Sequence, residues 1–562
     1  MPNKRAQWKS CVAVAALLAA TPAGARAADA GDWPMYGHGY DNTRFSPLTE
    51  ITAGNVGKLK LAFAFSLGSL RSNESTPIVI GDTLYVSSSW GPKFVYALDA
   101  RTGAMKWKYE PDIPDDVLQY ACCDVDNRGV TYADGKIFVG RLDGHLVALD
   151  AKTGKELWDT KVVDYTQGSV ITSPPLVVKN LVITGFGGGE YGVRGSLQAY
   201  DINTGKQVWK TWTVPGPGEP GNDTWKGDSW QHGGAAPWLV GSYDPKTNTV
   251  FWGTSNPGPW NAAVRSTGTS DYGKLTNLYS ASTLALDADT GRIKWYVQDT
   301  PEDAWDFDGV NELVLADLKI DGQTVPVYMK ADRNGFFYVV NRDTGKLISA
   351  EKYVPANWAT SVDLTTTRPV EVSSKRPTAD HPAKDVCPNL IGGKNWQPMS
   401  YNPDTGLVYI PSNNVCMDWK VSSVKYRRGV FYLGGEFPPV PGPGGYLGEL
   451  IAWDPVAHKQ VWGIKEDLPF NGGTLSTAGG VTFYGDLHGI FKALDAKTGK
   501  ELWSMNVGSG VGAGPISYSV DGKQYVAVVA GRTVSLAAFV GGIGEKMLAA
   551  TPEGGTLFVF SE

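Results

Sequence analysis

Two carboxylates two residues apart, Asp306 and Asp308, stand beside two aromatic rings in the run 304–309. On an extended segment, side chains at positions i and i+2 point to the same side, so both carboxylates would converge on one small volume. Like charges this close repel each other unless a proton or a cation lies between them. Because hard cations take oxygen ligands, we interpret this run as part of a metal-dependent reaction centre. The alternative is a solvated acidic turn.

Two other runs carry oxygen donors that would complete such a site. Glu190 follows the glycines 187–189, and small residues let a backbone approach a ligand closely. Asn256 offers an amide oxygen just before a proline-rich turn. Together with Asp306 and Asp308, these side chains form an all-oxygen set, which suits a hard, highly charged cation and not zinc or copper.

Adjacent cysteines, Cys122 and Cys123, are the most unusual local feature. Their Cα atoms lie about 3.8 Å apart across a trans peptide, at or below the usual range for a disulfide, so a bond between them closes an eight-membered ring. We expect this vicinal disulfide in an oxidising compartment, where its flat surface would support a planar ligand. Two free buried thiols are the alternative.

Composition and the N-terminus indicate an exported protein. Only 19% of the 562 residues are charged, while 68 glycines and 20 tryptophans suit short packed strands and tight turns. Residues 1–27 read as a secretory signal peptide, with a basic start, a short apolar run and Ala-Arg-Ala at the end. Its removal leaves 47 basic and 57 acidic residues, which argues against nucleic-acid binding. No second apolar stretch is long enough for a membrane span. We therefore expect a periplasmic location.

Several common chemistries lack their sequence patterns here. The six histidines show no metal-ligand spacing. No Gly-x-Gly-x-x-Gly follows a strand and opens a helix, so a nicotinamide-binding fold is not expected. The nucleophile elbow Gly-x-Ser-x-Gly is also missing. Without Cys-x-x-Cys-His, the chain carries no covalent c-type haem of its own.

A repeated unit must position these groups. Alternating apolar residues predict a strand, Asp-x-x-Thr-Gly predicts a tight turn, and the returning strand ends on a large side chain. Most of these terminal residues lie 41 to 53 positions apart, about the length of one four-stranded propeller blade. The copies are residues 95–107, 146–158, 197–209, 283–295, 337–348, 450–462 and 491–503. The fifth copy ends on Ile348 and the sixth lacks the Thr-Gly pair.

Seven copies and a lead-in strand at 59–65 predict an all-β fold, an eight-bladed β-propeller with tryptophan-docking blade repeats. Residues 28–562 would form this single domain. The apolar run 555–560 is expected to pair with N-terminal strands and close the ring, which removes exposed sheet edges. The two longer gaps, 209–295 and 348–462, are expected to be long loops over one face.

Taken together, these features resemble the pyrroloquinoline quinone (PQQ)-dependent methanol/ethanol dehydrogenase family. The marks are the cysteine pair within Ala-Cys-Cys-Asp, the runs 305–312, 332–335 and 416–419, and the Trp-ended repeats. The resemblance covers essentially the whole mature chain. It implies an eight-bladed propeller with PQQ and a metal ion in a central, funnel-shaped site.

The resemblance also implies roles for the oxygen donors. Glu190, Asn256 and Asp306 match the family's metal ligands, and Asp306 also matches the proposed general base. Arg333 matches the cation near the quinone oxygens. Calcium-type enzymes resemble one another in carrying a small residue two positions after the catalytic Asp, whereas Asp308 is the mark of the lanthanide type. One more negative ligand favours a trivalent ion, and calcium remains the alternative.

Further residues match contacts to the quinone. Trp238 would form one wall of its slot and the vicinal disulfide the other. Gly189 lies in a run that replaces the family's Ser and Ala pattern, so its contact would be made by backbone alone or lost. Cys387 and Cys416 match a second family disulfide. The full set of expected cofactor-binding residues is Glu74, Cys122, Cys123, Arg128, Thr172, Gly189, Trp238, Arg333 and Asn395.

Substrate preference is where the chain departs from the family. Trp260 would shield the substrate pocket, but Asn471 stands where methanol-type enzymes carry Trp and resembles the ethanol-type branch. The segment 531–542 lacks the tryptophan-rich loop, which predicts a wider pocket. The expected function is a periplasmic PQQ-dependent alcohol dehydrogenase that oxidises primary alcohols and passes electrons to a cytochrome c, with a homodimer as a further expectation. Alternatives are a PQQ enzyme for aldehydes, polyols or polymeric alcohols, and a non-enzymatic propeller scaffold.

Overall fold

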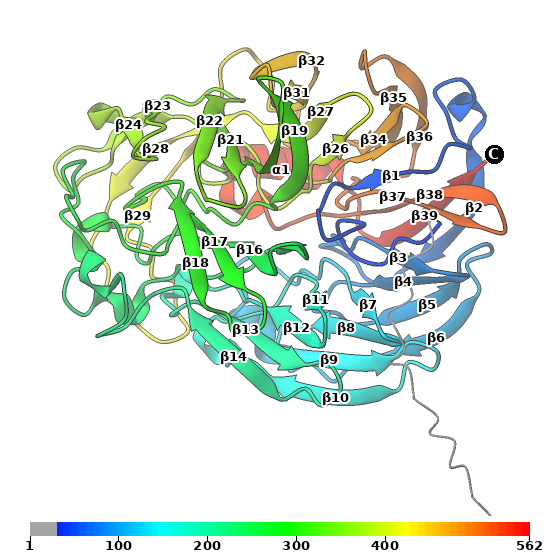
Figure 1. Ribbon diagram of the computed structural model, residues 1–562, viewed down its shortest axis with the longest axis horizontal. Helices are drawn as coiled ribbons and strands as arrows, with labels where there is room; N and C mark the ends of the chain where they lie inside the picture. The colour runs from blue at the N-terminus through cyan, green and yellow to red at the C-terminus, as the bar shows by residue number, and fades with distance from the viewer. Residues whose placement is uncertain (1–30) are drawn as a thin grey trace, which may run out of the picture.

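A computed structural model describes residues 31–562, so the predicted signal peptide lies outside the described residues. The described chain is an all-β propeller, in which four-stranded sheets follow one another around a ring in chain order (Figure 1). The one α-helix of this region is α1 (Gly541–Ala550). Within residues 31–562, no helix has the length and apolar character that a bilayer span needs.

Each of the larger sheets is an antiparallel meander, and the last strand of several lies at the outer rim (Figure 1). The first four are β3–β6 (Ile78–Ile80, Thr83–Ser87, Val95–Asp99, Met105–Tyr109), β7–β10 (Thr131–Ala133, Lys136–Gly140, His145–Asp150, Glu156–Lys161), β11–β14 (Leu176–Val178, Leu181–Thr184, Ser196–Asp201, Gln207–Trp212) and β15–β18 (Ser242–Asp244, Thr249–Gly253, Ser282–Asp287, Ile293–Gln298). The next are β19–β22 (Val314–Ile320, Gln323–Ala331, Phe336–Asn341, Leu347–Lys352), β26–β27–β31–β32 (Ser400–Asn402, Leu407–Asn413, Gly448–Asp454, Lys459–Glu466) and β33–β36 (Leu475–Thr477, Val481–Gly485, Ile490–Asp495, Glu501–Asn506), with β1 (Phe45–Ser46) parallel to β33.

The remaining large sheet joins the two ends of the described chain. Strand β2 (Lys60–Ser66) pairs antiparallel with β39 (Gly555–Ser561), and Lys60 lies opposite Ser561. Strands β38 (Lys523–Gly531) and β37 (Ile516–Val520) complete this sheet. The predicted pairing of residues 555–560 with an N-terminal strand is therefore confirmed.

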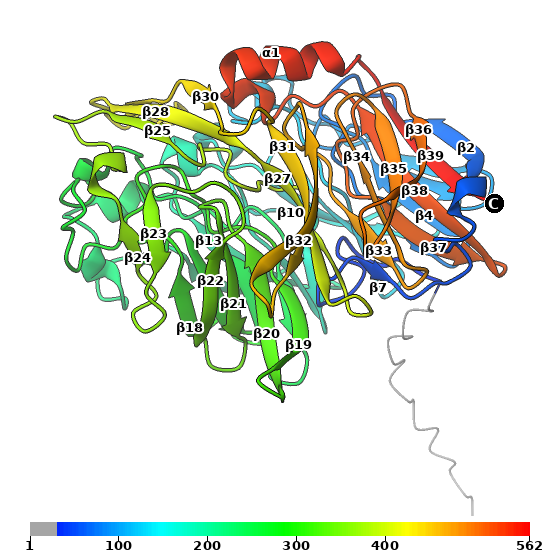
Figure 2. The ribbon, with the colours of Figure 1, turned by 90° about the horizontal axis from the view of Figure 1, so that it is seen from above.

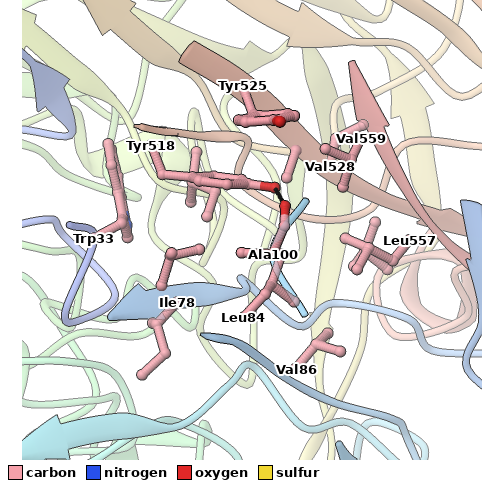
Figure 3. Close-up of a cluster of buried hydrophobic side chains, with 14 of the residues drawn as sticks. Trp33, Ile78, Leu84, Val86, Ala100, Tyr518, Tyr525, Val528, Leu557 and Val559 are labelled. Atoms are coloured by element: carbon pink, nitrogen blue, oxygen red, sulfur yellow. Dashed lines mark hydrogen bonds between the residues drawn. The ribbon is translucent and has the colours of Figure 1, made fainter. Parts of the chain in front are cut away.

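Neighbouring sheets pack face to face through apolar side chains, as Figure 3 shows beside the joining sheet. Leu84 of β4 and Val528 and Leu557 of β38 and β39 are fully buried in one cluster. The Tyr518 hydroxyl donates to the Ala100 carbonyl oxygen at 2.5 Å, so a polar contact also links the two sheets. Alternation along each strand supplies these buried faces.

The tryptophan side chain at the end of a repeat packs against the turn of the following sheet. Trp158 Nε1 donates to the Ile202 carbonyl oxygen at 3.1 Å. Gly205, in the same turn, has a φ of +65°, and a Cβ there would lie 2.7 Å from the Trp158 ring, so glycine meets both demands. The same indole-to-carbonyl bond joins Trp107 to Ala151, Trp209 to Ala288 and Trp462 to Ala496.

The longer of the two gaps between repeats, residues 348–462, is predicted to be a long loop, but it also contains strands. It forms a hairpin of β23 (Ala359–Val362) and β24 (Pro369–Glu371), and a sheet of β25 (Ala383–Val386), β28 (Val415–Val421), β29 (Gly435–Glu436) and β30 (Pro439–Pro441). Figure 2 shows β25, β28 and β30 on the same face of the ring as α1. Strands β24 and β30 contain proline, and β29 has only two residues, so no alternating pattern predicted these strands. Helix α1 was also unpredicted; it buries Ile543 and Met547, four positions apart.

Candidate active site

Eight segments that are far apart in the sequence line one cavity. They include loops around residues 121–128, 187–190, 390–396 and 535–539. The predicted site residues among them are Cys122, Cys123, Arg128, Thr172, Glu190, Trp238, Asp306, Arg333 and Asn395. The fold thus brings together most of the residues that the sequence singled out.

Both expected disulfides are present. Cys122 is bonded to Cys123, with the Cα atoms 3.8 Å apart, and both residues line the cavity. Cys387 is bonded to Cys416, which ties the loop 387–396 to strand β28. Trp238 also lines the cavity, so the two components of the predicted slot lie around the same space.

The Asp306–Asp308 segment is not extended, and our reasoning from strand geometry was wrong. Asp306 has a φ of +64°, and no strand is assigned to residues 304–309. The carboxylates nevertheless converge, because Arg333 bridges them: its guanidinium lies 3.3 Å from Asp306 Oδ2 and 3.2 Å from Asp308 Oδ2. A buried guanidinium, not the backbone, brings these side chains together.

Asp308 is held by further donors. The Asn256 backbone N–H donates to Asp308 Oδ1 at 2.5 Å, and the Trp238 indole N–H donates to Oδ2 at 2.8 Å. The Asp308 side chain has no exposed surface. This carboxylate therefore connects the loop of Asn256, the indole of Trp238 and the guanidinium of Arg333.

Glu190 lies in the short turn η4 (Gly189–Tyr191), close to the same loop. A Cβ on Gly189 would lie 2.6 Å from Asn256 Oδ1, so glycine allows the turn to approach the amide. Burial, reinforced by the Asp308 carboxylate, raises the pKa of Glu190 to about 7. Burial also raises the pKa of Asp306 well above its usual range, while the guanidinium of Arg333 opposes that shift.

These donors fit a hard cation. Within residues 31–562, Asn256 Oδ1 and Asp306 Oδ1 are buried without a hydrogen-bond partner. Buried oxygens without donors suit a cation, and all members of the set are carboxylate or amide oxygens. No cluster of three or more His, Cys, Asp or Glu side chains meets metal-site geometry in the described residues. The set includes an amide, and two of its carboxylates are paired with Arg333.

Another guanidinium organises the opposite part of the cavity. Arg128 pairs with Glu74 Oε2 at 2.8 Å and donates to Thr172 Oγ1 at 2.8 Å. It also lies over the rings of Trp238 and Trp396, 5.3 Å and 4.8 Å from their centres. Glu74 lies behind the lining and is completely buried. The donors of Arg128 and Asn395 thus give this part of the cavity a polar edge beside two aromatic rings.

The sequence did not single out two groups around Arg128. Asp126 accepts a hydrogen bond from Arg128 at 3.1 Å, and Ser535 Oγ donates to Glu74 Oε1 at 2.5 Å. Asp126 lies three residues after the cysteine pair, and this proximity could have indicated that it belongs to the site. Ser535 is 461 positions from Glu74, and no local pattern marked it.

The two predicted substrate-pocket residues do not line the cavity. Trp260 is 2% exposed and packs on Trp419, with 5.6 Å between ring centres. Asn471 is 1% exposed, and its side chain lies close to the buried carboxyl of Glu74. The apolar wall consists instead of Ala121, Val170, Leu390, Ile391, Leu536 and Phe539. Three residues of the segment 531–542, Ser535, Leu536 and Phe539, line this cavity, and the wider pocket expected from the missing tryptophan-rich loop stays a prediction.

Comparison with known proteins identifies the family of this chain. A family model for PQQ enzymes, described as glucose/ethanol/alcohol dehydrogenase, beta-propeller domain, matches residues 33–388 and 447–526. The chain belongs to the PQQ-dependent alcohol dehydrogenase family. The resemblance inferred from the motifs is thereby confirmed.

Relatives of this PQQ-dependent dehydrogenase cover nearly its whole length. The lanthanide-dependent methanol dehydrogenase of Methylacidiphilum fumariolicum is 44% identical over 526 residues, 89% of this chain and 85% of that protein. The quinoprotein alcohol dehydrogenase PedH of Pseudomonas putida is 42% identical, over 93% of this chain and 90% of that protein. A solved europium-containing methanol dehydrogenase has a TM-score of 0.90 and 42% identity, covering 95% of this chain and 98% of that chain.

Proposed function

We propose that this PQQ-dependent dehydrogenase oxidises primary alcohols of the methanol or ethanol class to aldehydes, with PQQ and a lanthanide ion as cofactors. One observation carries the proposal: a single cavity combines Trp238, the vicinal disulfide and the Asp306–Arg333 pair beside a buried set of oxygen donors. Relatives named as lanthanide-dependent methanol dehydrogenase and quinoprotein ethanol dehydrogenase support the substrate class.

Residues already described would hold the two cofactors. Trp238 and the Cys122–Cys123 disulfide would flank the planar quinone, and Arg128, Thr172 and Asn395 would bind its edge, with Glu74 holding Arg128 from behind the lining. Glu190, Asn256, Asp306 and Asp308 would supply oxygens to the ion. When bound, PQQ supplies two-electron redox chemistry and the ion supplies Lewis acidity.

Asp306 is the proposed general base for the alcohol proton. Arg333 holds Oδ2, which leaves Oδ1 without a partner in the described chain. A cation beside this carboxyl would favour its ionised form, the form that accepts a proton. Leu390 and Leu536 are buried in the apolar wall, so they limit the access of water to the substrate.

The count of carboxylates supports a trivalent ion. The buried carboxylates of Asp306 and Asp308, the half-buried carboxylate of Glu190 and one guanidinium leave an excess of negative charge, which a lanthanide would balance more fully than calcium. Calcium-supported activity is the alternative outcome that a metal series would detect.

We propose that the eight meander sheets are eight blades, with tryptophan docking between consecutive blades. The strand orders and the four indole-to-carbonyl bonds support this assignment. We further propose that the enzyme is periplasmic and assembles as a homodimer. Because the sequence contains no Cys-x-x-Cys-His haem motif, we propose that the enzyme passes its electrons to a separate cytochrome c. The sequence pattern of residues 1–27 supports the location.

Reconstitution of the purified mature protein tests the proposed function. PQQ is added with La³⁺, with Ca²⁺ or without an ion, and activity is followed with methanol, ethanol, butanol, glycerol and an aldehyde, using an artificial electron acceptor. We expect a bound-quinone absorbance band and alcohol oxidation with La³⁺. Protein that takes up no PQQ would support the scaffold alternative, and activity confined to aldehydes or glycerol would point to another substrate class.

A further inference from the structure

Asp308 contacts the wall of the slot as well as the proposed ion site. We propose that Asp308 is a positioning residue for Trp238, so that one carboxylate aligns both the ion site and the quinone slot. The identity of the ligand in the slot rests on the proposed function. The alignment itself rests on contacts within the protein.

The decisive contact is a hydrogen bond to a charged acceptor. Trp238 Nε1 lies 2.8 Å from Asp308 Oδ2, and an indole has only this one donor. Asp308 cannot turn away freely, because its Oδ1 accepts the Asn256 backbone N–H at 2.5 Å. Hydrogen bonds to an ionised acceptor are roughly twice as strong as neutral ones, and this one is shielded from solvent.

The two cation–π contacts of Trp238 do not fix which way its N–H points. The guanidinium carbons of Arg128 and Arg333 lie 5.3 Å and 5.8 Å from the centre of the indole. Such contacts attract the π face of a ring and are compatible with either orientation of its edges. The bond to Asp308 is therefore the polar interaction that favours one orientation of the indole.

The same carboxylate pairs with Arg333, which bridges to Asp306. A cation that binds Oδ2 of Asp308 must share this oxygen with the indole or compete with it, and one that binds Oδ1 must share that oxygen with the Asn256 N–H. Occupancy of the oxygen donors and the orientation of Trp238 are therefore linked through a single side chain.

Indole NMR of the full mature protein, without PQQ or added ion, tests the proposal. Tryptophans carry ¹⁵N at Nε1, and the variant Trp238→Phe identifies the Trp238 signal. In Asp308→Ala we expect this signal to shift and its N–H to exchange with solvent about tenfold faster, as for the loss of one hydrogen bond. Asp308→Asn keeps a single acceptor oxygen and should give an intermediate shift. An unchanged Trp238 signal in Asp308→Ala would overturn the proposal.

Asp303 provides a matched control in the same loop. It is buried and accepts the backbone N–H groups of Trp305 at 2.9 Å and Phe307 at 2.8 Å. Asp303→Asn should leave the Trp238 signal unshifted, whereas an equal shift in both variants would assign the effect to loosening of the loop and reject the proposal. The remaining indole signals report whether each variant is folded. Because neither PQQ nor an ion is present, the result is independent of the reconstitution test.

Discussion

Asp308 adds a third carboxylate to a site that already contains Glu190 and Asp306. Its full burial means that its charge is compensated by neighbouring groups and not by water. Arg333 supplies one positive charge for this cluster. The residual negative charge explains why a trivalent ion is the proposed occupant.

Replacement of Asp308 by Ala tests this assignment through catalysis. We expect La³⁺-supported kcat/KM to fall by about 100-fold or more, because loss of even an indirect partner of a metal ligand costs 10- to 100-fold. Steady-state rates and the La³⁺ content of the protein are measured together. Asp303→Asn serves again as the loop control. Wild-type activity of Asp308→Ala with La³⁺ would reject the lanthanide assignment.

A second buried charge cluster makes stability depend on pH. Lys330 Nζ lies 2.6 Å from Asp299 Oδ2 and 2.9 Å from Asp332 Oδ2, and all three side chains are inaccessible to solvent. Burial raises the pKa of Asp299 to about 7, although Lys330 opposes the shift. In the unfolded chain the pKa of an Asp is about 3.9. The folded protein therefore holds this proton more tightly.

The sign of the pH effect follows from this difference. The proton on Asp299 stabilises the folded state fully below about pH 4, and this contribution is lost as pH rises through about 7. Between pH 4.5 and 7.5, the Tm of the wild type should therefore fall more steeply than that of Asp299→Asn, whose side chain does not titrate. Differential scanning calorimetry measures both slopes. Equal slopes would contradict the proposed proton.

Residue types at the site were predictable, but their partners were not. The composition of the 304–309 run and the Glu190 turn predicted oxygen donors, and these residues do gather. The predicted extended backbone was wrong at Asp306. Its φ is positive, and no sequence pattern predicts a positive φ for this residue, which is not glycine. Arg333 as a bridge and Ser535 as a partner of Glu74 arise from contacts between distant segments.

Between sheets, the tryptophan that ends a repeat combines a large apolar contact with one polar bond. Trp158 is 9% exposed, so its replacement by Ala should lower the free energy of unfolding by about 3–5 kcal/mol. Trp158→Phe keeps much of the ring but loses the bond to the Ile202 carbonyl, which should cost about 1 kcal/mol more than the loss of ring volume alone. Urea unfolding separates the two variants. Wild-type stability of Trp158→Ala would argue against docking.

Leu536 and Phe539, at the short turn η9 (Ala537–Phe539), form part of the apolar wall of the cavity, and we propose that this part of the wall limits substrate length. Truncation at Phe539→Ala should raise kcat/KM for hexanol relative to ethanol about tenfold, since each buried CH₂ is worth about 0.8 kcal/mol. A series of straight-chain alcohols measures this ratio. Leu548→Ala, on α1 and outside the lining, is the control. Equal ratios in the wild type and Phe539→Ala would exclude Phe539 as a length determinant.

Elements with a repeat were easier to predict than elements without one. Alternation recurs in seven places and the complete Asp-x-x-Thr-Gly turn in five of them, so each copy supports the interpretation of the others. Strands β28 and β30 occur once, and α1 opens with Gly541 and Gly542, which are weak helix formers. Packing against the face of the ring, and not local propensity, accounts for these elements.

At the scale of the whole molecule, the sheet of β2 and β39 closes the ring. Strand β39 pairs with β2 on one side and β38 on the other, and buries Leu557, Val559 and Phe560 completely. Deletion of residues 555–562 would expose two strand edges and remove about 2 kcal/mol of burial for each of these side chains. We expect aggregated or unfolded protein by size-exclusion chromatography. Deletion of Glu562 alone is the control, and a monodisperse, folded protein lacking residues 555–562 would contradict this role.

Closure by strands so distant in sequence also imposes an order of events on the growing polypeptide. Strand β2 emerges before every other member of its sheet, and its partner β39 follows only after all the intervening sheets have been made. Long-range pairing of this kind is slow, because the chain must first lose the entropy of a very large loop. A nascent chain therefore holds an unpaired β2 throughout most of its synthesis, and assembly of the ring must end where it began.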